Sequence, residues 1–321
     1  MCTAISHGSY AGRNLDVEKD YGEEVIITPK NYAFTFKRHA TIPTHYAIIG
    51  MGIVSDEYPL YFDAANERGL YAAGLNYLGN AKYGSSTDDK TPIAPYELIP
   101  YILSTCATVR EAEYELEKIR LIDVRFKENM PVAELHFFIA DKGSSIVVEP
   151  DVDGLKVYKN PIGVLTNNPP FPTQLFLLNN FMNLSSEPGE NRFSSSLSLE
   201  RYSYGMGAIG LPGDLCSTSR FVRAAFHKAN AASRENLTDI MHLLSSVSMP
   251  DGSVKLGCGY ERTEYTSAID LSRLIYSYRT YDSPLTYSVK MSGEDLEGDS
   301  LIHYELKREK EPLLINGPHR Y

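Results

Sequence analysis

A cysteine at position 2 is the first residue of this sequence that could do chemistry. Cys2 directly follows the initiator Met1 and has a small side chain, so removal of Met1 would leave it as the N-terminus. A terminal cysteine carries both a thiol and a free α-amine, whose reference pKa values are about 8.5 and about 7.7–8.0. The amine can therefore act as a base for the thiol near neutral pH, and one residue supplies the nucleophile and base that covalent catalysis requires.

The residues after Cys2 predict a β-hairpin. Residues 2–6 and 10–16 are rich in β-favouring side chains, and a glycine-containing turn lies between them. Such a hairpin would place Arg13 and Asp16 beside Cys2, where a guanidinium favours a thiolate and a carboxylate can hold the terminal ammonium. The alternative is a structural hairpin with a small buried cysteine and two surface charges, and this stretch taken alone favours that alternative.

Three residues far along the chain could complete an active site. Asn76 ends a predicted strand, and Asn167 opens a turn that precedes two prolines. A side-chain or backbone N–H at such a corner can donate to a developing oxyanion, which is worth on the order of a few kcal/mol of barrier. Arg220 begins an amphipathic helix and could bind a carboxylate or neutralise a buried acid. Taken singly, each has a simpler interpretation as a turn-forming asparagine or an exposed arginine.

The overall composition indicates a globular protein with an acidic surface. The chain has 321 residues, of which 43% are hydrophobic and 22% charged, so it can bury a sizeable core. Its formal net charge of −10 argues against nucleic acid or an anionic membrane as a partner, because both require a basic face. No apolar run reaches the length of about 18 residues that a membrane span needs, and no secretory signal is visible, so a cytoplasmic protein is expected.

The cysteines and histidines predict neither a disulfide framework nor a metal site. Cys2, Cys106, Cys216 and Cys258 lie far apart without a CxxC pair, which indicates reduced thiols. The histidines show no metal-binding spacing, and no metal or other cofactor is expected. A dyad between Cys106 or Cys216 and a histidine stays open, although no local pattern supports it. Residues 205–210 match GxGxxG, but no βαβ unit frames them, so a flexible glycine-rich loop is predicted.

The order of predicted elements is strands, helices, strands, helices, strands. Strands are predicted at residues 24–38 with a break at 29–31, and at 45–54, 60–64, 70–77, 133–140, 145–149, 155–158, 162–166, within 261–291, and near 301–306. Helices are predicted at residues 95–105, 108–119, 171–182, 218–232 and 237–247. The polar, serine-rich segment 184–204 is predicted to be a long excursion or an assembly arm. No change in composition along the chain marks a domain boundary. This order of elements fits an α+β fold in which two antiparallel sheets pack face to face with helices outside both.

Short motifs occur throughout the chain: Met1-Cys2-Thr3, Gly12-Arg13-Asn14-Leu15-Asp16, Tyr58-Pro59-Leu60, Asn66-Glu67-Arg68-Gly69-Leu70, Ala73-Gly74-Leu75-Asn76, Gly163-Val164-Leu165-Thr166-Asn167-Asn168-Pro169, Gly210-Leu211-Pro212-Gly213-Asp214 and Ser219-Arg220-Phe221. As a set, in this order and at this spacing, they resemble the choloylglycine hydrolases, which are the bile salt hydrolases and penicillin V acylases among the N-terminal nucleophile hydrolases. The resemblance covers nearly the whole chain, and it is the set rather than any single motif that makes it specific.

The resemblance implies a four-layer αββα sandwich that forms one domain over residues 2–321 after Met1 is removed. By position it implies six catalytic residues: Cys2, Arg13, Asp16, Asn76, Asn167 and Arg220. Cys2 would be the nucleophile with its own α-amine as base, and Arg13 and Asp16 would line the thiol and the amine. The two asparagines would lie on the oxyanion side, and the second arginine near the nucleophile.

The implied substrate is a conjugated bile acid, from which glycine or taurine leaves. Asn rather than Tyr at position 76 is more similar to bile salt hydrolases than to penicillin V acylases. A penicillin V acylase or another acyl-amide hydrolase of the same mechanism, and a non-catalytic steroid-binding protein, remain as alternatives. The family resemblance also implies a homotetramer, with residues 184–204 as the assembly segment. An apolar pocket for the steroid is expected to include five side chains: Leu15, Val54, Tyr58, Val124 and Phe126.

Overall fold

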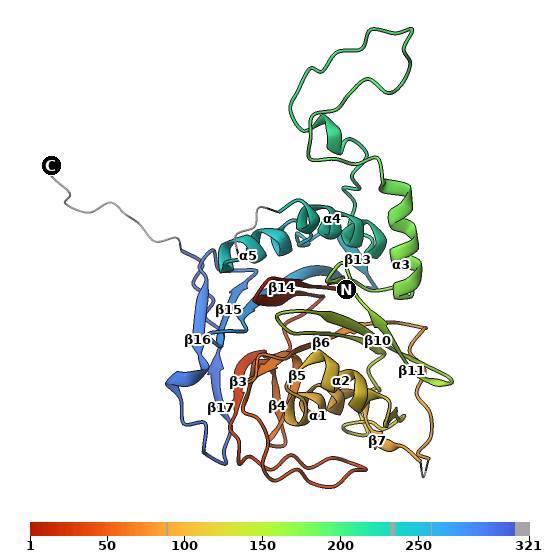
Figure 1. Cartoon of the computed structure of the whole chain (residues 1–321). Coiled ribbons are helices and arrows are strands. Elements are labelled where there is room, and N and C mark those ends of the chain that lie inside the picture. The colour runs from red at the N-terminus through yellow and green to blue at the C-terminus, as the bar shows by residue number, and fades with distance from the viewer. Residues whose placement is uncertain (88, 232–234, 258, 312–321) are drawn as a thin grey trace, which may run out of the picture.

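The computed structural model describes residues 1–87, 89–231, 235–257 and 259–311, and Figure 1 shows its course. The strands are β1 (Cys2–His7), β2 (Tyr10–Val17), β3 (Glu24–Thr28), β4 (Ile48–Ser55), β5 (Tyr58–Asn66), β6 (Tyr71–Asn76), β7 (Thr91–Ile93), β8 (Ile119–Leu121), β9 (Leu135–Ala140), β10 (Ser145–Asp151), β11 (Gly154–Lys159), β12 (Val164–Leu165), β13 (Val254–Leu256), β14 (Gly259–Asp270), β15 (Ile275–Thr280), β16 (Tyr287–Lys290) and β17 (Ile302–Glu305). The α-helices are α1 (Leu98–Thr105), α2 (Val109–Leu116), α3 (Phe171–Leu177), α4 (Ser217–Ala229) and α5 (Leu237–Ser245).

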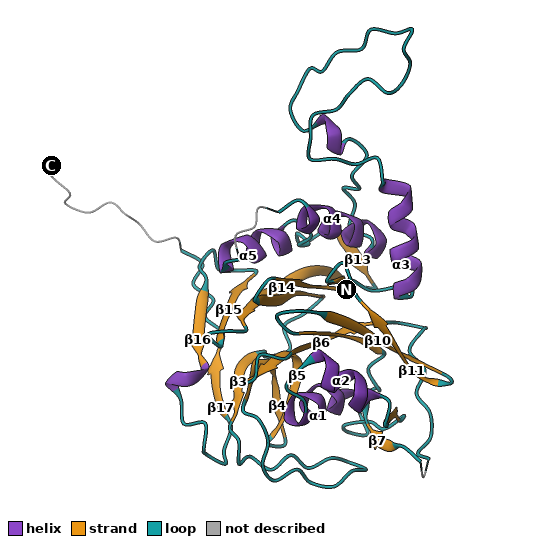
Figure 2. Ribbon diagram, in the orientation of Figure 1, coloured by secondary structure: helices purple, strands orange, loops and turns teal. Residues whose placement is uncertain are grey.

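Two antiparallel sheets form the middle of the molecule. The first has the strand order β12-β1-β2-β14-β15-β16, with β13 paired to β14, and the second has the order β11-β10-β9-β6-β5-β4-β3-β17. In Figure 2, α4 and α5 cover the outer face of the first sheet, and α1 and α2 cover the outer face of the second. The four layers are therefore helix, sheet, sheet, helix, which confirms the predicted α+β sandwich.

Hydrophobic side chains fill the spaces between these layers. One buried cluster joins the facing sides of the two sheets and continues to α4 and α5, with Phe138, Phe221 and Tyr265 among its members. A second cluster lies between the second sheet and α1 and α2, where Phe137 and Leu103 are buried. Phe137 and Phe138 are neighbours on β9 and point into different clusters, as the alternation of side chains along a strand requires.

The hairpin of β1 and β2 confirms the prediction for the N-terminus. Cys2 pairs with Leu15, and Ala4 pairs with Arg13. Because side chains alternate along a strand, these four residues share one face of the sheet, and the residues between them share the other. The inner face looks toward the second sheet, so the thiol of Cys2 points into the sandwich.

Several predicted boundaries differ from the structure. The predicted break at 29–31 is confirmed, because β3 ends at Thr28 just before Pro29. The predicted continuation to residue 38 is wrong, since the strand pairing that the described residues show there is a single bridge between Phe34 and Ile42. The predicted helix 108–119 ends at Leu116, and its last predicted residue belongs to strand β8. Strand β13 was not predicted. The predicted helix 218–232 extends to a residue outside the described part of the chain.

The segment 184–204 contains no helix or strand. Figure 1 shows it as the larger part of a loop that projects away from the body beyond α3. The glycine-rich residues 205–210 lie where this loop returns, around a short 3₁₀ turn at Met206–Ala208. The predictions of an excursion and of a glycine-rich loop are therefore confirmed, and the function of the excursion as an assembly arm stays a prediction.

Candidate active site

The thiol of Cys2 contacts a buried arginine. Arg13 Nη2 lies 2.6 Å from Cys2 Sγ. Arg13 Nη1 donates to the backbone carbonyls of Phe62 and Gly74, each at 2.8 Å, and the Arg13 side chain is fully buried. Those two carbonyls belong to the second sheet, so the guanidinium bridges both sheets and is fixed at the sulfur.

The opposite face of the same hairpin holds a second buried arginine. Arg220 Nη1 donates to the Cys2 carbonyl at 2.7 Å and to Thr3 Oγ1 at 2.5 Å, and it lies 3.7 Å from Asp16 Oδ2. Thr263 Oγ1 donates to Asp16 Oδ1 at 2.6 Å. Asp16 Oδ2 is buried and accepts no hydrogen bond from any described residue. Alternation along β2 thus places Arg13 at the thiol and Asp16 on the other face, near the backbone of Cys2.

Asn167 connects the main chain of Cys2 to the rest of the site. Asn167 Oδ1 accepts from the backbone nitrogen of Cys2 at 2.9 Å and from Arg220 Nη2 at 2.7 Å. Asn167 Nδ2 donates to the main-chain carbonyl of Asn76 at 2.8 Å. The side chain of Asn76 is half-buried and makes no hydrogen bond with another described residue. Its N–H groups are therefore free to donate to a bound molecule.

Met1 occupies the space beside this site. Its ammonium donates to Glu261 Oε1 at 2.6 Å and to the Asp16 carbonyl at 2.5 Å. Removal of Met1 would expose the nitrogen of Cys2 as an amine. That nitrogen already lies at Asn167 Oδ1, so the free amine would start from a fixed position.

The electrostatic environments of the two arginines differ. Burial acts to lower the pKa of Arg13, but the negative groups around it, including Cys2 and Asp63, outweigh burial and raise the pKa above its ordinary value. Burial lowers the pKa of Arg220, although Asp16 opposes that shift. An arginine remains charged in either case, so two cations lie on opposite sides of Cys2.

The structure brings all six predicted catalytic residues together from distant parts of the chain. It separates the five predicted pocket residues. Leu15 is paired with Cys2 and belongs to the cluster between the sheets. Tyr58, Val54 and Phe126 pack with the cluster on the outer side of the second sheet, where the Tyr58 and Phe126 rings lie 5.9 Å apart. Val124 is half-buried next to this group along the chain. Their joint role as a steroid pocket stays a prediction.

Several contacts of the site were not foreseen from the sequence. The carbonyls of Phe62 and Gly74 that hold Arg13 carry no signal in the sequence, because every residue has a carbonyl. Thr263 is one polar residue in an alternating strand, and only the pairing of β14 with β2 brings it to Asp16. Register across the sheet is therefore the information that sequence reasoning lacked.

The remaining cysteines lie away from this site. Cys106 is buried, and its sulfur lies 3.5 Å from the hydroxyl of Thr105. Cys216 is exposed, and its sulfur lies 3.2 Å from the hydroxyls of Thr218 and Ser219. Among the described residues, neither sulfur forms a hydrogen bond with a histidine. Cys258 lies outside the described residues.

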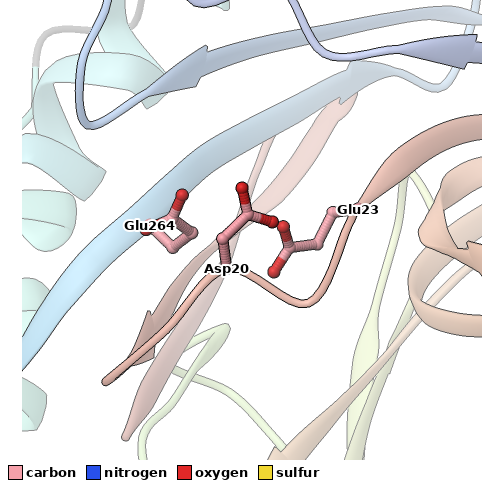
Figure 3. A group of neighbouring side chains, drawn as sticks. All are labelled: Asp20, Glu23 and Glu264. Atoms are coloured by element: carbon pink, nitrogen blue, oxygen red, sulfur yellow. The ribbon is translucent and has the colours of Figure 1, made fainter.

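One group of carboxylates has the spacing of a metal site. Figure 3 shows Asp20, Glu23 and Glu264 facing one another. Arg308 Nη1 lies 2.6 Å from Glu264 Oε1, and Arg308 Nη2 lies 2.9 Å from Asp20 Oδ2. Burial and a hydrogen bond with Asp20 raise the pKa of Glu23 to about 7. Arg262 also pairs with Glu264 at 3.0 Å, so two guanidinium groups already neutralise part of this cluster, and it gives no support to a metal.

Two packed antiparallel sheets between layers of helices are the fold of the N-terminal nucleophile hydrolases, and this chain has that fold. The sequence model of the linear amide C–N hydrolases of the choloylglycine hydrolase family matches residues 2–304. The chain belongs to this family and is an amide hydrolase.

Curated relatives match over almost the full length. The chain is 45% identical over 324 residues to a bile salt hydrolase/transferase of Lactiplantibacillus plantarum, covering 98% of this chain and 100% of the relative. It is 33% identical to a bile salt hydrolase/transferase of Clostridium perfringens, covering 96% and 98%.

Solved structures agree with this assignment. A mutant conjugated bile acid hydrolase from C. perfringens superposes with a TM-score of 0.92 at 32% identity, covering 98% of this chain and 100% of that one. The penicillin V acylase of Agrobacterium tumefaciens has a TM-score of 0.75 at 22% identity, covering 96% and 92%, which shows the shared fold. None of the helices in the described part of this chain combines the length and apolar character that a bilayer crossing requires.

Proposed function

We propose that this chain hydrolyses the amide bond of glycine- or taurine-conjugated bile acids, with Cys2 as the nucleophile. The observation that carries the proposal is the fixation of Cys2 at three points. Arg13 contacts its sulfur, Asn167 its nitrogen and Arg220 its carbonyl. Residues at a chain end are normally free to move. Three buried contacts on Cys2, so close to the chain end, therefore indicate that its position matters for its function.

The reaction begins when the free α-amine of Cys2 accepts the thiol proton and the sulfur attacks the substrate carbonyl carbon. The C–S bond forms while the carbonyl π-electrons move to oxygen. Asn76 Nδ2 donates to this oxyanion, and Arg13 balances the negative charge on sulfur before attack. Asn167 Oδ1 holds the amine in its proton-accepting position throughout.

Collapse of the tetrahedral intermediate breaks the C–N bond. The Cys2 ammonium gives its proton to the leaving nitrogen, so glycine or taurine departs and an acyl-thioester remains. The amine then takes a proton from water, whose oxygen attacks the thioester, and the bile acid leaves as the thiol re-forms. Asp16 Oδ2, buried and without a hydrogen bond among the described residues, would accept from the charged amine.

The bile acid part of the proposal rests on the relatives and on one residue. Both curated relatives described above are bile salt hydrolases by name, and the one from L. plantarum covers this chain almost end to end. Asn76, whose side chain makes no hydrogen bond with another described residue, would donate its amide N–H to the oxyanion, and Asn rather than Tyr at this position favours bile salts. Of the predicted pocket residues, Leu15 pairs with Cys2 and would offer apolar surface to a steroid at the site.

Release of glycine and taurine from glycocholate and taurocholate tests the proposal, with penicillin V as the comparison substrate. We expect turnover of at least one bile salt, with kcat/KM about tenfold or more above that for penicillin V. Cys2→Ala should remove turnover and still bind the bile salt. Preference for penicillin V would assign the acylase reaction instead. Binding of bile salts without turnover by the unaltered protein would leave only a steroid-binding protein.

We further propose that residues 2–321 form one domain and that the projecting arm at 184–204 joins four copies into a homotetramer. The arm exposes large apolar side chains, including Phe193, Tyr202 and Tyr204, which water does not favour. Light scattering should give a mass of four chains of 35.9 kDa each. Substitution of these three side chains by serine should lower that mass, and an unchanged tetramer would refute the role of the arm.

We also propose that the protein works in the cytoplasm. Cys106 and Cys216 are free thiols in the structure, and a reducing compartment keeps such thiols unoxidised. Cell fractionation with an antibody against the native chain tests this location, and recovery outside the cell membrane would contradict it.

A further inference from the structure

A surface cavity of about 690 Å³ lies at the opposite end of β1 from Cys2. Its wall includes Ser6 of β1, Gly163 just before β12, and Lys228 in the last turn of α4. Ser6 lies four residues after Cys2, which is about 13 Å along an extended strand, so the cavity is separate from the catalytic site. No step of the proposed reaction uses it.

The cavity has a positive lining on a negatively charged protein. Its charged side chains are Arg110, Lys142, Lys159 and Lys228 against Glu113 and Asp141. The carboxylate of Asp141 accepts hydrogen bonds from three backbone N–H groups nearby, which disperses its charge. The whole chain carries a formal charge of −10, so a cationic concave surface is a local exception that favours anions.

Lys228 is half-buried, whereas the other three cationic side chains of the lining are exposed. Its ammonium donates to the Ile162 carbonyl at 2.5 Å, and among the described residues no carboxylate forms an ion pair with it. Burial lowers the pKa of Lys228, with no neighbouring acid to oppose the shift. A partly desolvated ammonium next to a cavity gains more from an anion than an exposed lysine does.

Gly163 makes room for this ammonium. Its φ of +64° lies in the left-handed region, and a Cβ at this position would be 2.4 Å from Lys228 Nζ and 2.7 Å from Ser6 Oγ. A side chain here would therefore collide with both groups. The absence of a side chain leaves an ammonium and a hydroxyl side by side at the cavity wall, and both can donate hydrogen bonds to one oxyanion.

We propose that this cavity binds a small organic oxyanion through Lys228 and Ser6, with the exposed lysines 142 and 159 at its rim. The shared chemistry is a phosphate, sulfonate or carboxylate head group. Lysine binds such groups as a mobile point charge, which suits a tetrahedral or a planar anion. The volume leaves space for a small organic body beside the head group.

Calorimetric titration of the full-length protein tests this site with three probes: inorganic phosphate, methanesulfonate and acetate. Ionic strength is held constant with sodium chloride, so that general screening does not change. We expect saturable binding of at least one probe at one site per chain. Lys228→Met keeps the alkyl stem and removes the charge, and it should weaken that binding about tenfold or more.

Lys255→Met is the matched control, because Lys255 is an exposed lysine on β13 outside the cavity lining. It should leave the affinity unchanged. If Lys228→Met fails to fold, the double variant Lys142→Met with Lys159→Met alters only exposed side chains and should still weaken binding severalfold. Non-saturable heat for all three probes, or equal affinity in the cavity and control variants, would overturn the proposal. Loss of bile salt hydrolysis has no bearing on either outcome.

Discussion

Replacement of Asn76 by alanine gives a sharp test of the proposed oxyanion donor. The Asn76 side chain makes no hydrogen bond with another described residue, so its loss breaks none. The main-chain carbonyl of residue 76 still accepts from Asn167 Nδ2, and the pairing of β6 with β9 uses only backbone groups. We therefore expect the unfolding free energy to change by less than about 1 kcal/mol.

The expected effect on catalysis is much larger. Removal of one oxyanion donor costs about 2.7–4 kcal/mol of barrier, which is a fall of about 10²–10³-fold in kcat. KM should stay within about threefold, because the donor acts on the oxyanion more than on the ground-state carbonyl. The assay is steady-state release of the amino acid from taurocholate and glycocholate, together with urea unfolding of the same preparations.

Asn80→Ala is the matched control, since Asn80 is a half-buried asparagine in the turn that follows β6. It should keep kcat within about twofold of the unaltered enzyme. A variant of Asn76 that retains more than a third of kcat would refute the donor role. An equal fall in kcat for both variants would show that the turn, and not the amide, is what matters.

Two further predictions concern buried polar groups. Thr263→Val should lower the unfolding free energy by about 1–3 kcal/mol, because Asp16 Oδ1 and the Met249 N–H both lose a buried hydrogen-bond partner. Urea denaturation measures this loss, and an unchanged unfolding midpoint would contradict the prediction. Glu23 has a pKa of about 7, above its ordinary value of about 4.5, so the folded state binds this proton more tightly and loses stability as pH rises from about 4.5 to 7. Glu23→Gln should remove a decline on the order of 1–3 kcal/mol over that window, and identical pH profiles of stability for both proteins would refute the assignment.

The sequence predicted the hairpin of β1 and β2 and the layer order because both follow from local patterns. The alternation of apolar and polar side chains and the glycines of turns can both be recognised from residues that are close in the sequence. The same holds for the cap of α2, where the Thr108 hydroxyl accepts from the Glu111 N–H three residues later. The continuation predicted for residues 32–38 is wrong for the same reason. Its side chains favour β structure, but apart from the bridge between Phe34 and Ile42 no strand in the described part of the chain pairs with it.

The site itself was predictable only through resemblance to a family. Nothing local links Arg220 to Cys2, which are separated by 218 positions along the chain. Alternation along the strand puts Arg13 and Asp16 on opposite faces of the sheet. Which of the two faces points toward the second sheet depends on the packing of the sheets, and the sequence does not show it. The role of Glu261 as partner of the Met1 ammonium likewise depends on tertiary placement.

Intact-mass measurement during turnover tests the central claim most directly. Protein quenched within the first turnovers of taurocholate should have the mass of a chain without Met1, and part of it should carry one additional cholyl group. Peptide mapping should place that group on Cys2. Full activity in protein that retains Met1, or an acyl group on any other residue, would contradict catalysis by an N-terminal cysteine.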